Sequence, residues 1–323
     1  MDEITDIPPD DVMAELGSFQ DLLAASVPRK RLEDNLLIAT WNIKQFGGLD
    51  QTWETKPTNS PKRNLRALRF IAEIVSQFDV IALQEVRGTL KSLRHLMKAL
   101  GPDWAFLLTD VNQGTAGNDE RMAFVFDTRR VRPSGLACEL VVPPEWRQEV
   151  GENVLREQFA RSPYAVSFYS AGQTFIVVTL HVLYGEAPAD RIPELRGIAK
   201  WMAGWAEQEE EWRHNLLVLG DFNTENAGDP TYEALTSTGL HVPLEIRDLS
   251  NTNLPGADLP KHYDQISWFL GGESGSRLTL KYAGHAGMVD FTKAVFRELN
   301  NADLQWRMSD HLPLWVEFGI PRA

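Results

Sequence analysis

The sequence predicts an α/β protein in which two packed β-sheets carry helices on their outer faces. Short β-rich apolar runs alternate with helical patterns from Leu36 onward, which is typical of mixed α/β domains. These runs fall into two successive halves of mixed strands and helices. A chain of 323 residues also has the length to bury a substantial core.

Strands of the first half are predicted where apolar runs are short and bounded by polar residues. They lie at Leu36–Ile43, Val80–Leu83, Trp104–Thr109, Met122–Phe126 and Leu136–Val142, and the last three are assigned to a first sheet. Helical apolar spacing predicts helices at Asn64–Phe78 and Leu90–Leu100.

The second half follows the same alternation. Its strands are predicted at Tyr164–Phe168, Thr174–Leu180, Leu216–Leu219, Gln265–Leu270, Leu278–Tyr282 and Leu314–Phe318. A helix rich in Trp and Glu is expected at about Ile192–Trp212. Turn-rich loops, expected to form the rims of a cleft, lie at Gly48–Pro61, Gly114–Glu120 and Asn251–Pro260.

Residues 1–34 are predicted to be an N-terminal extension, and residues 35–323 a single domain. After Pro8-Pro9, apolar residues recur at helical spacing with acids between them, which indicates an amphipathic helix. This helix either docks on the domain or forms an arm that binds a partner, and we favour docking. It carries no residue with evident chemistry.

The formal net charge of −13 argues against a protein that stores polyanions by bulk attraction. A bound metal and a few local arginines can reverse the field inside one cleft, so a phosphate ester substrate remains compatible with this charge. The acidic balance favours brief engagement of a substrate with turnover.

Cys138 is the only cysteine, which excludes an internal disulfide and a cysteine-based zinc site. The acidic N-terminus lacks the basic start and apolar run of a secretory signal, and the apolar runs are much shorter than a membrane span. We therefore expect a cytoplasmic monomer without membrane association and without a disulfide-linked partner. A leader removed earlier would leave no trace in this sequence.

Compact polar groups stand at the ends of five apolar strands. Strand ends on one edge of a sheet converge in space, so these groups are expected to share a site. They are Asn42, Gln84-Glu85, His181, Asp221 with Asn223, and Ser309-Asp310-His311.

Each group taken alone has an ordinary structural explanation. Asn42 can form a turn, Glu85 can be an acid at a helix N-terminus, and His181 can be a core histidine with satisfied hydrogen bonds. Asp221 and Asn223 can simply belong to a polar turn. The occurrence of all five groups at strand ends favours a site.

The residue types suit phosphate chemistry around a hard cation. Mg²⁺ or Mn²⁺ takes oxygen ligands, and Glu85 with Asn42, joined by Asp310, forms such a set. Asp221 is expected to orient or deprotonate a water, and the Asn223 amide to donate to a phosphoryl oxygen. The sequence does not distinguish Asp221 from a metal-bound hydroxide as the group that removes the proton.

Two histidines beside a phosphate would stabilise charge that develops in the transition state. Each needs a carboxylate that fixes its tautomer and keeps it protonated. Glu120 and Asp264 are the candidates for this role.

Five ordered segments resemble the motifs of the endonuclease/exonuclease/phosphatase superfamily. They are Ala39-Thr40-Trp41-Asn42-Ile43, Leu83-Gln84-Glu85-Val86, Leu219-Gly220-Asp221-Phe222-Asn223, Tyr263-Asp264-Gln265-Ile266 and Ser309-Asp310-His311-Leu312-Pro313. The resemblance spans Leu36 to Gly319 and implies a four-layer α/β sandwich with its site at one edge of two packed sheets. It also implies one divalent ion, usually Mg²⁺, with Glu85 as the main ligand and Asn42 and Asp310 close to the metal or its waters.

The same resemblance assigns roles around the phosphate. It implies that Asp221 and Asn223 position the nucleophile and the phosphate. It further implies that His181 and His311 contact the phosphate, with His311 oriented by Asp264.

The likeness is greatest to the deoxyribonuclease I branch. Arg87 follows the metal Glu85 by two residues, as in that branch, where the arginine contacts nucleic acid. Glu120 begins a strand similar to the one that supports the histidine, which implies support of His181. Arg161 lies in a Phe-x-Arg-x-Pro segment whose arginine reaches a phosphate. Arg87 and Arg161 can equally be salt-bridge residues.

The chain also departs from that branch. Asn118 stands where the branch stacks a tyrosine on a sugar, which puts binding in a duplex groove in doubt. The disulfides of the secreted enzymes are absent, which fits an intracellular or bacterial relative. Residues 284–304 have no counterpart. Tyr263 either donates to the phosphate or packs, and we favour the phosphate; the remaining histidines have no motif context.

The leading hypothesis is a Mg²⁺-dependent phosphodiesterase that acts on DNA or RNA, with nucleic acid as its partner. A second hypothesis keeps the chemistry and changes the substrate to a phospholipid, an inositol phosphate or a nucleotide. A third is a binding protein of the same fold that has lost catalysis, and it is disfavoured because every expected polar position is filled. The choice between endonuclease and exonuclease, and the role of residues 1–34, do not follow from the sequence.

Overall fold

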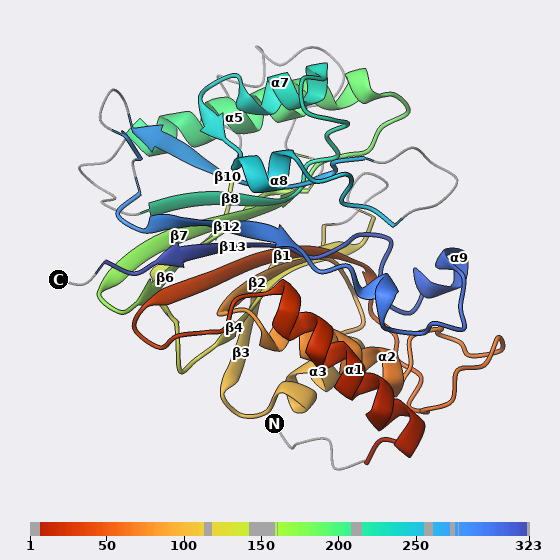
Figure 1. Cartoon of the computed structure of the whole chain (residues 1–323). Coiled ribbons are helices and arrows are strands. Elements are labelled where there is room, and N and C mark those ends of the chain that lie inside the picture. The colour runs from red at the N-terminus through yellow and green to blue at the C-terminus, as the bar shows by residue number, and fades with distance from the viewer. Residues whose placement is uncertain are drawn as a thin grey trace.

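The computed structural model describes residues 7–112, 118–141, 159, 161–207, 215–254, 261–271, 275–276 and 278–321. Two β-sheets pack face to face, and helices cover both outer faces (Figure 1). The four-layer sandwich expected from the sequence is thus confirmed. Within the described residues, each helix is too short or too polar to cross a bilayer.

The first sheet has six strands in the order β12-β13-β1-β2-β4-β3. Its strands are β1 (Asn35–Phe46), β2 (Val80–Arg87), β3 (Trp104–Leu108), β4 (Glu120–Asp127), β12 (Lys281–Met288) and β13 (Leu314–Gly319). The helices α1 (Asp10–Ser26), α2 (Leu65–Ser76) and α3 (Lys91–Leu100) cover its outer face (Figure 1).

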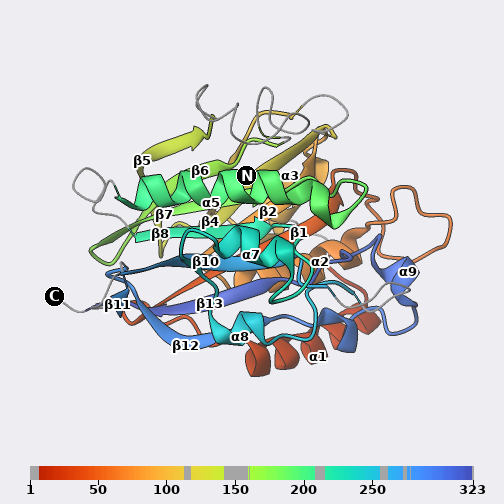
Figure 2. The same ribbon diagram turned by 90° about the horizontal axis from the view of Figure 1, so that it is seen from above.

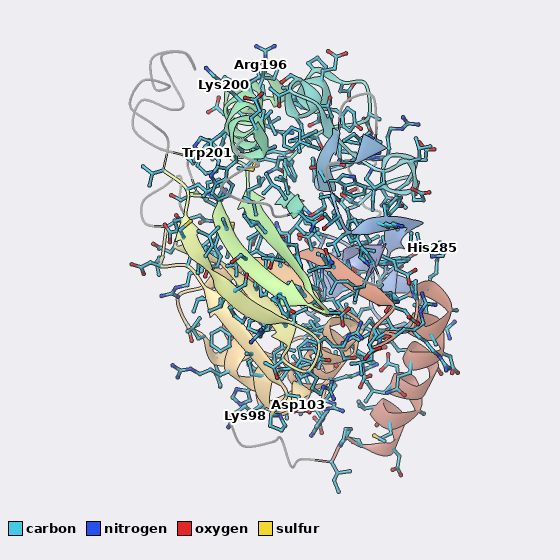
Figure 3. All side chains as sticks on the ribbon, turned by 90° about the vertical axis from the view of Figure 1, so that its left-hand side faces the viewer. Lys98, Asp103, Arg196, Lys200, Trp201 and His285 are labelled. Carbon is cyan, nitrogen blue, oxygen red and sulfur yellow. The ribbon has the colours of Figure 1, made fainter. Side chains whose placement is uncertain are left out.

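The second sheet has seven strands in the order β11-β10-β8-β7-β6-β5, and β9 pairs with β10. These strands are β5 (Arg132–Glu139), β6 (Tyr164–Ser170), β7 (Gln173–His181), β8 (Asn215–Asp221), β9 (Leu240–His241), β10 (Asp264–Gly271) and β11 (Gly275–Ser276). The helices on this side are α5 (Ile192–Glu207), α7 (Pro230–Thr236) and α8 (Leu244–Arg247), with η2 (Pro188–Arg191) preceding α5. Figure 2 shows α5 lying over the second sheet, and Figure 3 shows Arg196, Lys200 and Trp201 on this outer layer.

Alternation along the strands separates the core into layers. In β1, Leu37, Ala39 and Trp41 pack under the helices of the first sheet, whereas Leu36 and Ile38 pack between the two sheets. Successive side chains of a strand point to opposite faces, so one fully apolar strand serves two cores. A third cluster of buried residues lies between the second sheet and α5.

Helix α1 lies against α2, as expected for a docked helix. Phe19 meets Phe70 edge to face, with ring centroids 5.6 Å apart. Glu15 accepts a hydrogen bond of 2.7 Å from Arg66 and one of 2.6 Å from the backbone N–H of Phe296. The helix contributes buried side chains to the same core as β1, while the division at residue 34 stays a prediction.

Two strands differ from the prediction. The strand expected at Leu136–Val142 was assigned to the first sheet, but β5 pairs with β6 at the edge of the second sheet. The strand expected at Leu278–Tyr282 begins at Lys281 and runs to Met288. Apolar patterning identifies a strand without its partner, and β12 is a mostly exposed edge strand that carries little apolar signal. The predicted helix at Ile192–Trp212 is described only to Glu207.

The remaining short elements precede β13. They are η3 (Phe291–Lys293) and α9 (Asn301–Leu304), and they lie in the stretch that had no counterpart in the resemblance.

We predict that Gly220→Ala destabilises the protein strongly. Gly220 has a φ of 140°, and a Cβ added there would lie 2.1 Å from the carbonyl oxygen of Leu180 on the neighbouring strand. The clash falls on backbone, which cannot move aside, so the free energy of unfolding should fall by about 3 kcal/mol. Denaturant unfolding measures it.

Gly204→Ala is the matched control. Gly204 lies in α5 with open space where its Cβ would stand, so alanine should stabilise the protein by about 0.5–1 kcal/mol. Equal stability of the Gly220 variant and the parent protein would contradict the argument.

Candidate active site

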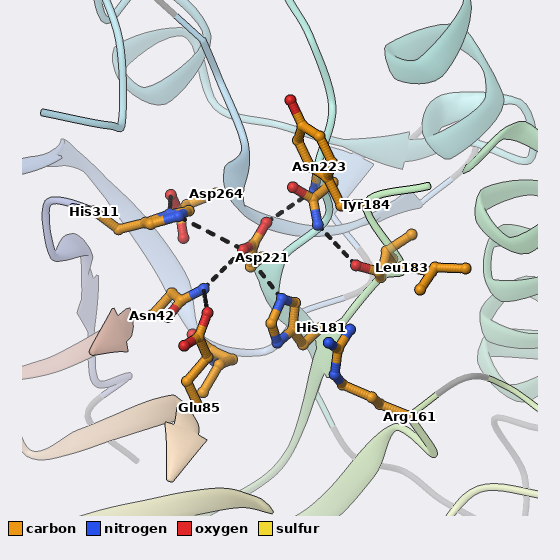
Figure 4. A network of polar contacts seen from close by, with 12 residues as sticks. Asn42, Glu85, Arg161, His181, Leu183, Tyr184, Asp221, Asn223, Asp264 and His311 are labelled. Atoms are coloured by element: carbon orange, nitrogen blue, oxygen red, sulfur yellow. Dashed lines mark hydrogen bonds and ion pairs between the residues drawn. The ribbon is translucent and has the colours of Figure 1, made fainter. Parts of the chain in front are cut away.

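The ends of six strands place their polar residues at one edge of the sandwich (Figure 4). The pairs β1–β2 and β7–β8 are parallel, so their carboxyl ends coincide. Strands β10 and β13 run antiparallel to their neighbours and therefore begin at this edge. The side chains delivered there are Asn42, Glu85, His181, Asp221, Asp264 and His311.

The two sheets are linked by buried polar contacts near this edge. Gln84 on β2 donates through one nitrogen to Thr40 on β1 at 3.0 Å and to Thr179 on β7 at 2.8 Å. Ser309 donates to the carbonyl of Asn42 at 2.6 Å and accepts from the N–H of His311 at 3.0 Å. These bonds fix the last motif relative to the end of β1.

Backbone irregularity directs Glu85 out of its strand. The pairing of β2 with β4 shifts register between Leu83 and Val86, and Glu85 has a φ of 61°. A non-glycine residue in the left-handed region costs about 1 kcal/mol or more, and such residues concentrate at functional sites. The Glu85 carboxylate accepts from Asn42 Nδ2 at 3.1 Å and from the Gln45 N–H at 2.9 Å.

Asp221 lies at the centre of the group and is only 1% exposed. It accepts from Asn42 Nδ2 at 2.9 Å and from the Asn223 N–H at 3.0 Å, and it faces His181 Nε2 at 3.5 Å and His311 Nε2 at 3.8 Å. Burial alone would raise the pKa of Asp221, but attraction to the two histidines and the hydrogen bond from Asn42 outweigh it and lower the pKa. The carboxylate therefore stays ionised at neutral pH.

His311 is held by Asp264. Its Nδ1 lies 2.8 Å from Asp264 Oδ2, and both side chains are buried. Burial opposes a charged imidazole, yet Asp264 and Asp221 attract it more strongly, so the pKa of His311 is well above its ordinary value. Burial raises the pKa of Asp264, and the charge of His311 offsets this only in part. The imidazole can donate from Nε2 at neutral pH.

Glu120 gathers one histidine and two arginines. His181 Nδ1 lies 3.2 Å from Glu120 Oε2, Arg161 Nε lies 2.9 Å from the same oxygen, and Arg87 lies 3.7 Å from Oε1. Asn118 donates to Oε1 at 2.5 Å. Burial would raise the pKa of Glu120, but these neighbours lower it. The ionised carboxylate thus positions both arginines beside His181.

The remaining predicted residues lie close by, with some differences in contact. The Asn223 side-chain amide donates to the carbonyl of Val182 at 2.7 Å, and Asn223 has a φ of 51°. The Tyr263 ring centroid lies 5.9 Å from that of His311, and its hydroxyl lies 3.4 Å from the Tyr184 hydroxyl. Desolvation raises the pKa of Tyr263, so the phenol stays neutral and can donate.

The three residues predicted to hold a metal differ in their contacts. Glu85 and Asn42 are in contact, whereas Asp310 pairs with Lys44. Asn42 presents its nitrogen to the carboxylates, and its oxygen accepts from the Lys44 N–H at 3.1 Å. In this structure Asn42 is thus a hydrogen-bond donor between Glu85 and Asp221, not an oxygen ligand.

A divalent cation fits best at Glu85. Among the described residues this half-buried carboxylate meets two N–H donors and forms no direct ion pair, although the buried Arg63 guanidinium is near enough to attract it. Asp221, Asp264 and His311 also have possible ligand atoms within 4.8 Å of one another. That group is a less suitable site, because the Asp264 carboxylate is already committed to His311 Nδ1 at 2.8 Å.

Two residues of the site environment were missed by sequence reasoning. Arg63 is 3% exposed and donates to five backbone carbonyls, which include those of Ile43 at 2.9 Å and Met308 at 2.9 Å. It links the segment after Asn42 to the segment before Asp310. Lys44, two residues after Asn42, gave a weak signal by its position, whereas Arg63, two residues after the turn-rich loop Gly48–Pro61, gave none.

Comparison with known proteins agrees with this geometry. The sequence profile of the Endonuclease/Exonuclease/phosphatase family matches residues 39–311, a stretch that includes Asn42, Glu85, Asp221 and His311. The chain belongs to this family. Its members named below include deoxyribonucleases, which supports an enzyme of the hydrolase class within the deoxyribonuclease I-like branch.

Curated relatives are similar at modest identity. A deoxyribonuclease of Thioalkalivibrio sp. (strain K90mix) is 28% identical over 315 residues, which cover 94% of this chain and 76% of that protein. Deoxyribonuclease-1 of Bos taurus is 27% identical over 213 residues, which cover 63% of this chain and 66% of the bovine protein.

Solved structures share the fold. The crystal structure of D. rerio TDP2 complexed with single strand DNA product matches with a TM-score of 0.56 at 14% identity, covering 88% of this chain and 98% of that chain. A mannosyl-6-phosphatase of Bacteroides thetaiotaomicron VPI-5482 matches with a TM-score of 0.56 at 17% identity, covering 88% of this chain and 99% of that chain. The fold therefore accommodates different phosphate substrates.

We predict that Asp264→Asn lowers the pKa of His311. The substitution removes the nearest negative charge, while the burial that disfavours the imidazolium remains. NMR titration of the imidazole in metal-free protein measures the change. The control is Asp248→Asn, which changes an exposed aspartate beside α8 and should leave the midpoint of the His311 titration unchanged. An unchanged midpoint in the Asp264 variant would show that another group holds the proton.

Proposed function

We propose that this protein is a divalent-metal-dependent phosphodiesterase that hydrolyses nucleic acid. The observation that carries the proposal is the single buried network in which Asn42 joins Glu85 to Asp221, with His181 and His311 on either side. The deoxyribonuclease names of relatives at up to 28% identity support nucleic acid as the substrate class.

In the proposed reaction Asp221 orients the attacking water and accepts its proton as the water oxygen bonds to phosphorus; the ester P–O bond opposite breaks, and the leaving oxygen takes a proton from the surrounding water. Its lowered pKa keeps it ionised, and its hydrogen bonds to Asn42 and the Asn223 N–H fix its direction. A fixed acceptor beside the phosphorus limits the water to one line of approach. The Asn223 amide turns from the Val182 carbonyl to a phosphoryl oxygen when substrate binds.

His311 and His181 stabilise the charge that develops on the phosphate. Protonated His311 donates from Nε2, since its Nδ1 is committed to Asp264. His181 faces Glu120 through Nδ1 at 3.2 Å, which leaves its Nε2 directed to the phosphate position. Preorganised donors of this kind act without reorganising during the reaction, which makes their contribution large.

The proposed cofactor is Mg²⁺, with Mn²⁺ as a substitute. Glu85 would be its main ligand, with Asn42 and Asp310 near its waters. When bound, the cation neutralises phosphate charge as a Lewis acid. The chain's own contribution is the strained backbone that holds the Glu85 carboxylate at the mouth of the site.

Arg87, Arg161 and Tyr263 are proposed to contact the substrate phosphates. Arg161 is 8% exposed and pairs with Glu120 beside His181, so its direction is set before substrate arrives. Arginine in such a position presents several N–H donors to phosphate oxygens.

We predict that Glu85→Gln, Asp221→Asn and His311→Ala each reduce cleavage by about 100- to 10,000-fold. Each removes a charge or a donor that the proposed reaction uses; Glu85→Gln and Asp221→Asn keep the shape of the site, whereas His311→Ala also leaves a cavity beside Asp264. The assay is nicking of plasmid and degradation of single-stranded oligonucleotide with Mg²⁺, compared with EDTA. His285→Asn, whose imidazole pairs with Glu317 on the far sheet edge, serves as the control.

Cleavage that persists in EDTA, or that survives Asp221→Asn, would refute the assignment of the site. The same preparation should be offered phospholipid, inositol phosphate and free nucleotide. If the protein hydrolyses one of these compounds and does not cleave nucleic acid, that compound's class is the substrate class, and the proposed hydrolytic chemistry still holds. Absence of turnover on every phosphate ester would favour a binding protein.

A further inference from the structure

Two neighbouring hollows lie beside the site on the side of the first sheet. One has a volume of about 340 Å³ and is lined by residues 44, 45, 47, 48 and 59–63 together with Arg87, Thr89 and Trp306. The other has a volume of about 380 Å³ and is lined by residues 88–91, Arg94, His95 and Lys98. The first hollow meets the second at Thr89, which lines both. Each volume is within the range of sites that hold a small ligand.

The lining of both hollows is cationic in an acidic chain. Lys44, Lys62, Arg63 and Arg87 line the first, and Lys91, Arg94 and Lys98 line the second. Among the described residues, neither lining includes Asp or Glu, although the whole chain carries a net charge of −13. A local reversal of sign of this kind favours a polyanion at this one surface.

Trp306 adds an aromatic surface at the end nearest the site. It is 43% exposed, which is unusual for so large an apolar side chain, and it follows α9 in the stretch before β13. The Lys44 ammonium lies 4.7 Å from the centroid of its ring. An exposed ring beside cations is the arrangement on which proteins stack an unpaired base while they contact its phosphate.

The first hollow is continuous with the site. Lys44 pairs with Asp310, and Gln45 donates to Glu85 at 2.9 Å. Arg87 pairs with Glu120, which holds His181. A strand bound in the hollow would therefore lead directly to the phosphate position proposed above.

The second hollow continues along α3, whose exposed residues include Lys91 and Arg94. Lys98 points outward from the layer of helices that covers the first sheet (Figure 3). Within the described residues, Arg94 forms no ion pair, so its charge is available to a ligand.

We propose that the two hollows form one track for a single nucleic-acid strand on one side of the scissile phosphate. Trp306 stacks on the unpaired base next to the site, and the α3 cations contact phosphates further along. The track gives preference to single-stranded or frayed nucleic acid, because a paired base does not expose its face to Trp306. This inference rests on the proposed function, whose substrate it specifies.

The test compares four variants on three substrates. The variants are Trp306→Ala, Trp306→Phe, Arg94→Ala and Lys281→Ala, the last being a control at an exposed lysine on the edge strand β12. The substrates are a single-stranded oligonucleotide, the matching duplex and bis(para-nitrophenyl) phosphate, a diester too small to reach the track. KM and kcat are measured with Mg²⁺ over a range of salt concentrations.

Trp306→Ala should raise KM for the single strand about tenfold, the size expected for one lost base stack. KM for the duplex should change much less, and hydrolysis of the small diester should be unchanged. Trp306→Phe should recover most of the loss. Arg94→Ala should reduce the slope of log KM against log salt by about 0.7, the contribution of one phosphate contact. Lys281→Ala should match the parent protein.

The track is overturned if the parent protein cleaves the single strand and Trp306→Ala and Arg94→Ala cleave it with unchanged KM. A loss in Trp306→Ala that is equal on the small diester also overturns it, because Trp306 would then shape the site itself. A parent protein that hydrolyses the small diester and no nucleic acid refutes the proposed function, which is a separate outcome. Cleavage of nucleic acid by the parent protein, together with the expected changes of KM in the variants, supports both the proposed function and the track.

Discussion

One amide connects the two halves of this protein at the point where their polar residues meet. Asn42 Nδ2 donates to Glu85 within its own sheet and to Asp221 in the other sheet. Two carboxylates brought so close repel each other unless donors and positive charges stand between them. The neighbouring imidazoles, the Gln84 bonds between the sheets and the Ser309 contacts all maintain this approach. Without the contacts of Asn42 with Glu85 and Asp221, each sheet would end in its own set of polar residues, and the two sets would not form one site.

Much of the fold could be predicted because the strands are apolar on both faces. Runs such as that of β1 identify themselves, and their parallel pairing puts Asn42 and Glu85 at a common edge. The sheet that receives β5 could not be predicted, since alternation does not encode a strand's partner. The position of β12 was similarly hidden by its alanine, glycine and exposed residues.

The site was predictable to the level of residue identity but not of contact. Glu120 could be placed near His181, yet its simultaneous pairing with Arg161 and Arg87 depends on the loop geometry of three segments. Asn42 acts as a donor because its side-chain nitrogen, and not its oxygen, faces the carboxylates. The spacing of residues in the sequence does not reveal this orientation. Arg63 was missed because its partners are backbone carbonyls, which carry no sequence signature.

The left-handed residues around the site have a consequence for the durability of the protein. Lys44, Gln45, Glu85 and Asn223 all have positive φ, with values between 39° and 61°. Each conformation is unfavourable for a side chain with a Cβ, so this edge is held in place by the rest of the sandwich. Glycine at these positions would relieve the backbone strain, and at Glu85 and Asn223 it would also remove a side chain that the proposed reaction uses. Selection for robustness and selection for catalysis therefore act in opposite directions on the same few peptide units.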